Sequence, residues 1–167
     1  MKGEKRIPPK NMINIEINVR PMTLDHVDKV WEIEKSCFAT PWSKQSLVKE
    51  LKTNALASYY VAFMNGELAG YAGMWKIVDE GHITNVAVLP KMQGLGVGSA
   101  LIAQLIEDGT RSKLRALTLE VRVGNHVARS LYEKYGFKIS GIRKEYYADT
   151  REDGYLMWKE LEEITEF

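Results

Sequence analysis

The chain has 167 residues, of which 45% are hydrophobic and 27% charged, a balance that is ordinary for a folded domain with one core. Its formal net charge of +1 gives no electrostatic reason to expect contact with nucleic acid or a membrane surface. The single cysteine, Cys37, excludes an internal disulfide and a multi-cysteine metal site, and we predict no bound metal.

The two ends of the chain differ from its middle. Residues 1–12 are polar and contain a Pro8-Pro9 pair but no apolar core, so we interpret them as a flexible leader and not as a secretory signal. No run in the sequence approaches the roughly 18 apolar residues of a membrane-spanning helix. We therefore predict a cytoplasmic protein with one domain over residues 13–160 and an acidic C-terminal tail over residues 161–167.

The first part of the domain predicts a strand followed by two helices. Apolar and polar residues alternate over residues 13–20, as in an edge strand, and Pro21 ends the pattern. Thr23 is placed to cap the first helix, and Ser43 to cap a second helix over residues 44–52. The apolar stripe of the first helix consists of Val27, Val30, Trp31 and Ile33.

The loop between these helices contains two aromatic residues around a proline. Phe38 and Trp42, on either side of Pro41, either staple the two helices together or form one wall of a substrate groove. The residue pattern leaves both interpretations open.

Three strands are predicted next. Apolar strands over residues 59–64 and 67–77 flank Asn65-Gly66, the strongest short hairpin signal in the chain. We predict a turn over residues 79–81 that leads into a third strand over residues 83–89, which is apolar and partly β-branched.

The third strand leads into a glycine-rich loop and a helix. Pro90 ends the strand, and apolar residues later recur at helical spacing up to about Ser112. Between them lie the alternating glycines Gly94, Gly96 and Gly98. Such a turn leaves backbone N–H groups free at a helix N-terminus, which is a preformed site for a phosphate or pyrophosphate. Taken alone, the glycines are equally compatible with a tight strand-to-helix turn.

Two known nucleotide-binding motifs can be compared with this loop. A P-loop needs a lysine followed by serine or threonine, and no lysine follows Gly98. The dinucleotide fingerprint G-x-G-x-x-G directly follows its strand, whereas here G-x-G-x-G comes after interposed residues. Glu120 on the next strand stands about where a ribose-binding acid would, so a dinucleotide-binding protein remains an alternative.

A strictly alternating strand is predicted over residues 116–123. Glu120 shares one face of this strand with Thr118 and Arg122, while the other face is apolar. By itself, this pattern favours a solvated polar face.

A helix and two closing strands complete the domain. Asn125 can cap a helix over residues 126–135, on which Tyr132 by itself resembles a half-buried packing residue. The closing strands are predicted over residues 137–147 and 155–159.

Several motifs together point to a known family. Gln93, Gly96 and Gly98 fit the pattern Q-x-x-G-x-G, which resembles the pyrophosphate loop of the GNAT superfamily of N-acetyltransferases. Three further stretches narrow the resemblance to the ribosomal-protein alanine N-acetyltransferase (RimI-like) branch, and the match covers most of the chain beyond the leader. They are FATPWS (38–43), DEGHITNVAV (79–88) and LEVRVGNHVARSLYEKYGFKISGIRKEYY (119–147).

The resemblance implies a fold and a co-substrate. The expected fold is α/β, with the central mixed, splayed β-sheet of the GNAT family flanked by helices on both faces. The expected cofactor is acetyl-CoA, with its pyrophosphate in the glycine loop and its pantetheine arm along the preceding strand. The implied cofactor-binding residues are Val86, Ala87, Val88, Gln93, Gly94, Leu95, Gly96, Val97, Gly98, Ser99 and Asn125.

The resemblance also implies catalytic roles for two side chains, Glu120 as general base and Tyr132 as general acid. An α-amine with a pKa near 7.7–8.0 must lose a proton to attack a thioester, and a carboxylate can accept that proton. A tyrosine hydroxyl can return a proton to the leaving thiolate, and a backbone N–H at Val88 can stabilise the oxyanion. Because the amine attacks directly, Cys37 receives no role.

The implied acceptor is the N-terminal peptide of a protein substrate, a small-subunit ribosomal protein that begins with alanine. We expect this peptide in a groove with Phe38, Pro41 and Trp42 on one side and Tyr146 and Tyr147 on the other. Acetylation of another amine, such as a lysine side chain, a polyamine or a small molecule, is the alternative.

Overall fold

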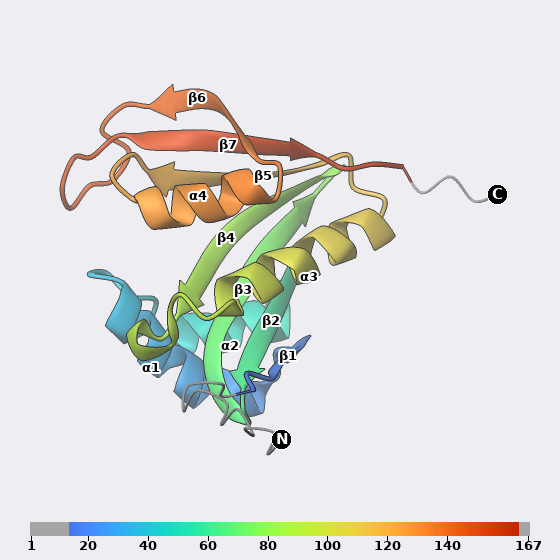
Figure 1. Ribbon diagram of the computed structural model, residues 1–167, viewed down its shortest axis with the longest axis vertical. Coiled ribbons are helices and arrows are strands. Elements are labelled where there is room, and N and C mark those ends of the chain that lie inside the picture. The colour runs from blue at the N-terminus through green and yellow to red at the C-terminus, as the bar shows by residue number, and fades with distance from the viewer. Residues whose placement is uncertain (1–13, 164–167) are drawn as a thin grey trace, which may run out of the picture.

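The computed structural model describes residues 14–163 (Figure 1). The predicted leader over residues 1–12 lies outside the described residues, as do residue 13 of the predicted first strand and residues 164–167 of the predicted tail. Within the described part, seven strands form one sheet in the spatial order β1-β2-β3-β4-β5-β7-β6.

The strands and helices follow one another along the chain largely as the sequence predicts. The strands are β1 (Ile17–Pro21), β2 (Ala57–Met64), β3 (Glu67–Ile77), β4 (Glu80–Val88), β5 (Ala116–Arg122), β6 (Lys138–Arg143) and β7 (Gly154–Glu160). The helices are α1 (Val27–Cys37), α2 (Lys44–Thr53), α3 (Val97–Arg111) and α4 (His126–Lys134), with short 3₁₀ turns at Leu24–His26 and Pro90–Met92.

The sheet opens between β4 and β5. These two strands are parallel, whereas the other neighbouring strands are antiparallel. Their pairing is short, because only residues 80–82 of β4 face residues 116–118 of β5. Beyond this point the strands diverge, as Figure 1 shows. The predicted α/β fold with a mixed, splayed sheet is therefore confirmed.

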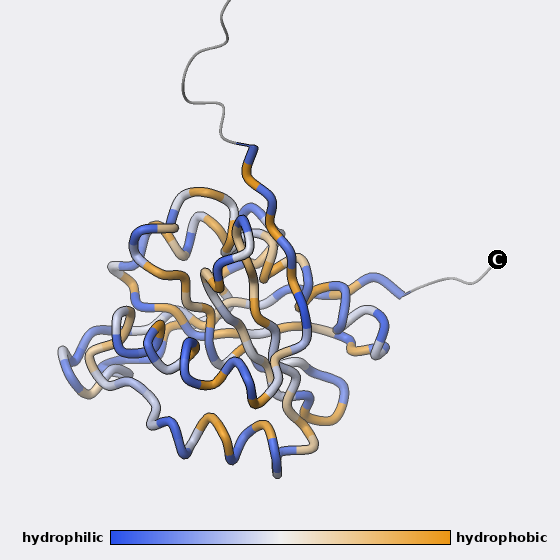
Figure 2. The backbone as a smooth tube through the Cα atoms, turned by 90° about the horizontal axis from the view of Figure 1, so that it is seen from below, coloured by the Kyte–Doolittle hydropathy of each residue, from blue (hydrophilic) through white to orange (hydrophobic). Residues whose placement is uncertain are grey.

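Helices cover both faces of the sheet. One face packs against α1 and α2 through a core that includes Ile33 and Leu47, and the other packs against α3 and α4 through Leu101 and Tyr132. Figure 1 shows α3 and α4 in front of the sheet and α1 and α2 behind it. In Figure 2 hydrophobic and hydrophilic stretches alternate along the outer helices, as expected for helices with one buried face.

A β-bulge in β4 changes which residues face each side of the sheet. Gly73 pairs with Asn85 and Met74 with Ile83, so Thr84 is the extra residue. Before the bulge, Ile83 packs in the core of α3, whereas after it Ala87 packs in the core of α1. Val86 therefore points to the α3 side and Asn85 to the α1 side.

Local hydrogen bonds explain several predicted boundaries. The Ser43 hydroxyl accepts a hydrogen bond from the Ser46 N–H at the start of α2, and the Asn125 side chain accepts one from the Ala128 N–H at the start of α4. Asn65-Gly66 forms the predicted hairpin turn between β2 and β3, and both of its residues have positive φ.

Several predicted boundaries are wrong. The first strand begins at Ile17, and residues 14–16 of its predicted range precede it without regular structure. Residues 80 and 81 belong to β4, and the turn before it instead uses Val78, which has a φ of 57°. Pro21 pairs with Tyr60 as the last residue of β1, which is possible because β1 is an edge strand. The first closing strand ends at Arg143, because Glu145 takes a φ of 49° and its N–H donates to the Asp153 carboxylate.

Candidate active site

The glycine loop ends in a helix N-terminus with free backbone donors. Gly94 and Gly96 have φ values of 76° and 96°, a region that favours glycine, and Gly96 is the N-cap of α3. The first N–H groups of α3 have no acceptor within the helix. Helix α3 therefore begins directly after Gly96, and the geometry suits an anion.

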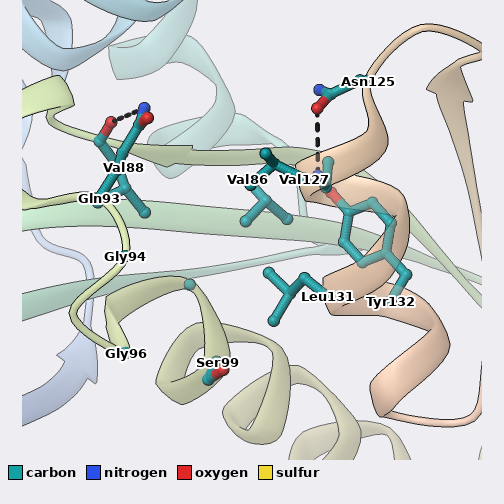
Figure 3. A pocket seen from close by; sticks show the side chains of 12 residues that line it. Val86, Val88, Gln93, Gly94, Gly96, Ser99, Asn125, Val127, Leu131 and Tyr132 are labelled. Carbon is teal, nitrogen blue, oxygen red and sulfur yellow. Dashed lines mark hydrogen bonds between the residues drawn. The ribbon is translucent and has the colours of Figure 1, made fainter.

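A cavity of about 440 Å³ lies beside this loop (Figure 3). We call it the cofactor cavity. Its wall is built from the end of β4, the glycine loop, the start of α3 and one face of α4. The lining residues are Val86, Val88, Gln93, Gly94, Gly96, Gly98, Ser99, Asn125, Val127, Ala128, Leu131 and Tyr132.

Most of the residues predicted to bind the cofactor line this cavity, but three do not. Ala87 and Val97 are buried in the two cores, and Leu95 is exposed, so only their backbone groups are available to a ligand there. Gln93 lines the cavity, yet its Nε2 donates to the Val88 carbonyl at 3.1 Å (Figure 3).

The predictions included Asn125 and Tyr132 but missed three further residues of α4 in this cavity. Val127, Ala128 and Leu131 line it, and Val127 is 82% exposed. The sequence held no comparable signal, because the exposure of Val127 is known only once the helix has been placed in the fold.

A second cavity, of about 490 Å³, opens on the α1 side of the sheet, and we call it the acceptor cavity. Its walls are the α1–α2 loop, the loop over residues 144–153 between β6 and β7, and the bulge of β4. The lining residues are Glu34, Cys37, Phe38, Ala39, Thr40, Trp42, Thr84, Asn85, Arg122, Tyr147, Asp149, Thr150 and Glu152.

The aromatic residues predicted to form a groove divide into two groups. Phe38, Trp42 and Tyr147 line the acceptor cavity, while Pro41 and Tyr146 do not. Trp42 also packs against the core under α1 and α2, as the stapling interpretation predicts, while its place in the cavity wall is compatible with the groove interpretation. Tyr146 is exposed and packs edge-on against Tyr147, with 5.1 Å between ring centroids.

Arg122 ties the β6–β7 loop to β5. Its guanidinium donates two hydrogen bonds to the Asp149 carboxylate and lies 4.0 Å from the centroid of the Tyr147 ring. The hydrogen bonds from Arg122 hold the pKa of Asp149 below its usual range. Burial raises the pKa of Tyr147 to about 12, although the Arg122 charge opposes that shift.

Glu120 and Tyr132 lie on opposite sides of β5. Leu119 and Val121 precede and follow Glu120 on β5, and both pack in the core of α3 and α4 together with Tyr132. Because side chains alternate along a strand, Glu120 points to the opposite face of the sheet. Its carboxylate forms an ion pair with Arg143 of β6 at 3.2 Å and lines neither cavity. Tyr132 lines the cofactor cavity, and burial raises its pKa to about 12, so its hydroxyl keeps its proton at neutral pH.

The backbone at the end of β4 faces the opening in the sheet. The Leu89 N–H donates to Ala69 of β3, and because successive residues alternate, the backbone groups of Val88 point away from β3. The Val88 carbonyl accepts hydrogen bonds from Cys37 Sγ at 3.2 Å and from Gln93. Burial raises the pKa of the Cys37 thiol, which does not favour a nucleophilic thiolate.

Glu34 is a second feature that the predictions missed. It is fully buried on α1 and accepts hydrogen bonds from Tyr71, Asn85 and the Trp42 N–H. Burial raises the pKa of Tyr71, and the charge of Glu34 raises it further, so the tyrosine is the donor. The signal was present in the sequence, because Glu34 follows Val27 and Val30 by seven and four residues and so lies on the buried face.

Comparisons with known proteins agree with this geometry. Residues 27–137 match the model of the acetyltransferase (GNAT) family. The chain belongs to the GNAT acetyltransferase family.

Relatives of this GNAT chain include N-terminal acetyltransferases. A Bacillus subtilis (strain 168) protein, provisionally named a ribosomal protein bS18-alanine N-acetyltransferase, is 44% identical over 87% of this chain and 96% of its own. The Escherichia coli (strain K12) protein of that name is 35% identical over 76% of this chain and 86% of its own. The crystal structure of the Escherichia coli S18-alanine N-acetyltransferase has a TM-score of 0.79 at 28% identity, covering 91% of this chain and 99% of that one.

The dinucleotide-binding alternative is wrong for this GNAT chain. Its sheet is largely antiparallel around β4, unlike the doubly wound parallel sheet that carries the fingerprint. Glu120 faces the side of β5 away from the glycine loop, where it cannot serve as the ribose-binding acid.

Two further properties concern the described residues. Between residues 14 and 163, the structure contains no group of three or more histidine, cysteine, aspartate or glutamate side chains arranged to hold a metal ion. None of the helices in this part of the chain combines the length and the apolar character needed to cross a membrane.

Proposed function

We propose that this GNAT acetyltransferase transfers the acetyl group of acetyl-CoA to the N-terminal α-amine of a protein. One observation carries the proposal: the two cavities lie on opposite sides of the sheet and share the end of β4, where the sheet opens. Val86 and Val88 line the cofactor cavity, and Thr84 and Asn85 line the acceptor cavity. A thioester and an amine that enter from opposite sides can meet at this opening.

The residues around the cofactor cavity fit acetyl-CoA. The free N–H groups at the start of α3 suit its pyrophosphate. Gly94 and Gly96 have no side chains, so the loop backbone can approach the phosphates closely. Gly98 packs closely against Leu131 in the cavity wall, where a Cβ on this glycine would lie 3.0 Å from the leucine side chain. Apolar residues of β4 and α4 would line the pantetheine arm. Acetyl-CoA supplies the activated thioester.

The side chains then have distinct tasks in direct transfer to the amine. Glu120 accepts the proton that the amine loses, directly or through water. The N–H groups of Val86 and Val88, which face the opening, donate to the carbonyl oxygen as it gains negative charge. Tyr132 gives its hydroxyl proton to the leaving thiolate, a task that suits a phenol still protonated at neutral pH.

The acceptor we propose is the N-terminal alanine of a small-subunit ribosomal protein. The names of the Bacillus and Escherichia relatives, which specify ribosomal protein bS18, support this choice. The acceptor cavity supports it physically, because Phe38, Trp42 and Tyr147 narrow the space available to the first side chain. A small first residue fits such a site, and backbone groups beyond it help to position the amine.

A panel of short peptides tests this function. The peptides differ only at the first residue, with alanine, serine, leucine or tryptophan, and each has a twin whose α-amine is blocked. Alanine and serine should react fastest with acetyl-CoA, leucine and tryptophan slowly, and blocked peptides not at all. Robust acetylation of a blocked peptide at an internal lysine would refute N-terminal transfer and favour the lysine alternative.

A further inference from the structure

Glu34 places a buried carboxylate at the acceptor cavity. It is 1% exposed and lines the cavity from α1. Its hydrogen-bond partners within residues 14–163 are all neutral donors, and no cation of that part of the chain pairs with it. A charge in this position is screened by salt much less than one on the surface.

Three separate elements hold this carboxylate in place. Oε1 accepts hydrogen bonds from the Tyr71 hydroxyl of β3 and from Asn85 Nδ2 of β4, the latter at 3.1 Å. Oε2 accepts one from the Trp42 N–H in the α1–α2 loop at 3.0 Å. Glu34 therefore cannot swing into solvent without losing all of these partners.

Asn85 gives an independent indication of what the cavity lacks. Its Nδ2 is used by Glu34, and its buried Oδ1 has no hydrogen-bond partner within the described residues. If the Asn85 amide were turned over, its Oδ1 would face Glu34 Oε1, and two hydrogen-bond acceptors would oppose each other. Asn85 is 8% exposed and lines the acceptor cavity, so a ligand rich in N–H donors can satisfy what the protein leaves unpaired.

The remaining charges of the acceptor cavity do not cancel Glu34. Asp149 and Glu152 also line the cavity, and a single cation, Arg122, contacts both of them. Among the lining residues, three carboxylates therefore face one guanidinium, which leaves an excess of negative charge.

We propose that Glu34 is a specificity-determining residue whose charge makes the acceptor cavity select cationic peptides. The proposal rests on the proposed function, because it assumes that the acceptor peptide enters this cavity. Lysine or arginine at the second or third position should favour binding, and glutamate or aspartate should oppose it, through Coulomb interaction with the cavity. Glu34 acts on the peptide as a whole and needs no contact with the reacting atoms.

The test uses three peptides that begin with alanine and carry lysine, glutamine or glutamate at the second position. We expect kcat/KM of the wild-type protein at low salt to be roughly tenfold higher for the lysine peptide than for the glutamate peptide. Glu34→Gln keeps the size of the side chain and removes its charge. It should reduce this ratio to about twofold to threefold, whatever its effect on the absolute rates.

Glu50→Gln is the matched control. Glu50 on α2 also accepts three hydrogen bonds, in this case all from side chains, those of Asn54, Tyr59 and Trp75, but it lies outside the acceptor cavity. This substitution should destabilise the protein in a comparable way and leave the lysine-to-glutamate ratio at the wild-type value.

A second variant avoids the buried network. Thr40 is exposed and lines the acceptor cavity, so Thr40→Lys adds a positive charge to its wall without disturbing Glu34. It should lower the lysine-to-glutamate ratio as well. If Glu34→Gln does not fold, an unchanged ratio in Thr40→Lys overturns the proposal, because it would mean that the second residue of the peptide does not sense the charge of this cavity.

The outcomes separate this proposal from the proposed function. A wild-type protein that acetylates no free N-terminus refutes the proposed function. If the wild type acetylates all three peptides equally, or if folded Glu34→Gln loses rate uniformly and keeps the wild-type ratio, only the assignment of Glu34 is overturned. A uniform loss would mean that Glu34 has a purely structural role.

Discussion

At the scale of single residues, the two proposed catalytic side chains differ in their surroundings. Tyr132 is 8% exposed and packs edge-on against Phe137, and its raised pKa keeps it protonated. Glu120 is partly exposed and paired with Arg143. Tyr132 thus has the surroundings of a protonated acid, and the Glu120 carboxylate is partly open to solvent, as its proposed role as the base requires.

The tyrosine can be tested by removing its hydroxyl. Tyr132→Phe should lower kcat by roughly 10²–10⁴-fold, because the leaving thiolate loses its proton donor. The affinity for acetyl-CoA should change little, since the ring remains in the wall of the cofactor cavity. Turnover and equilibrium binding of acetyl-CoA measure the two effects separately. Wild-type turnover would mean that Tyr132 is only a packing residue.

The glutamate can be tested against a matched carboxylate. Glu120→Gln should lower kcat most at pH values below about 7.7–8.0, where more of the α-amine is protonated and depends on a base. Glu80→Gln is the control, because Glu80 is similarly exposed (26% against 28%) and pairs with Arg115 at the far end of the sheet. A pH–rate profile of each variant distinguishes them. Equal profiles for both variants would favour a solvated glutamate without a catalytic role.

At the scale of elements, the site depends on how β4 ends. The bulge at Thr84 directs Val86 to the cofactor side and Asn85 to the acceptor side, so one strand serves both cavities. The early divergence of β4 from β5 leaves Val88, which pairs with Gly70 of β3 on one side, without a partner strand on its other side. The same strand thus lines both cavities. It also presents backbone N–H donors at the point where the two cavities approach each other.

The glycine loop can be tested with a pair of alanine substitutions. Gly96→Ala and Gly66→Ala both force alanine into a left-handed conformation, with no heavy atom closer than 3.5 Å to the added Cβ. Each should lower the free energy of unfolding by roughly 1–2 kcal/mol. Only Gly96→Ala should weaken acetyl-CoA binding, because Gly66 lies in the β2–β3 turn. Urea unfolding and acetyl-CoA titration measure the two effects, and equal binding by both variants would argue against a pyrophosphate site in this loop.

At the scale of the whole molecule, buried tyrosines make stability sensitive to alkaline pH. Burial raises the pKa values of Tyr60, Tyr132 and Tyr147 from 10.0 to about 12 each. The folded state therefore holds these protons more tightly than the unfolded state does. The resulting stability is fully present below pH 10 and is lost as the pH rises from 10 to 12.

We expect the free energy of unfolding to fall over that interval. The contribution of Tyr132, the most buried of the three, should be about 1.4 kcal/mol per pH unit. Tyr132→Phe should therefore show a shallower loss than the wild type. Urea unfolding at pH 8, 10 and 11 measures the slope. Parallel curves for the two proteins would show that Tyr132 does not titrate with a raised pKa.

Local signals allowed much of the fold to be predicted from the sequence. The two helix caps and the hairpin turn lie where predicted, at Ser43, Asn125 and Asn65-Gly66. Each depends only on hydrogen bonds and backbone angles within a few residues. The boundary at Tyr146 and Tyr147 was wrong, because the end of β6 depends on a hydrogen bond from the Glu145 N–H to Asp153, eight residues further on at the other end of the loop. Local patterns do not contain such a contact.

The order of the elements, the glycine loop and the family could all be predicted from the amino-acid sequence, because they depend on periodicity and short motifs. The hydrogen bond between Glu34 and Asn85 at the acceptor cavity could not, since these residues lie 51 positions apart on different elements that meet only in the folded chain. The tertiary structure also decided that Arg122 holds the β6–β7 loop while Glu120 pairs with Arg143. The charge partners of a strand face come from the elements that pack over that face in the folded protein. Those elements are far apart in the sequence, so no single stretch of it predicts the pairs.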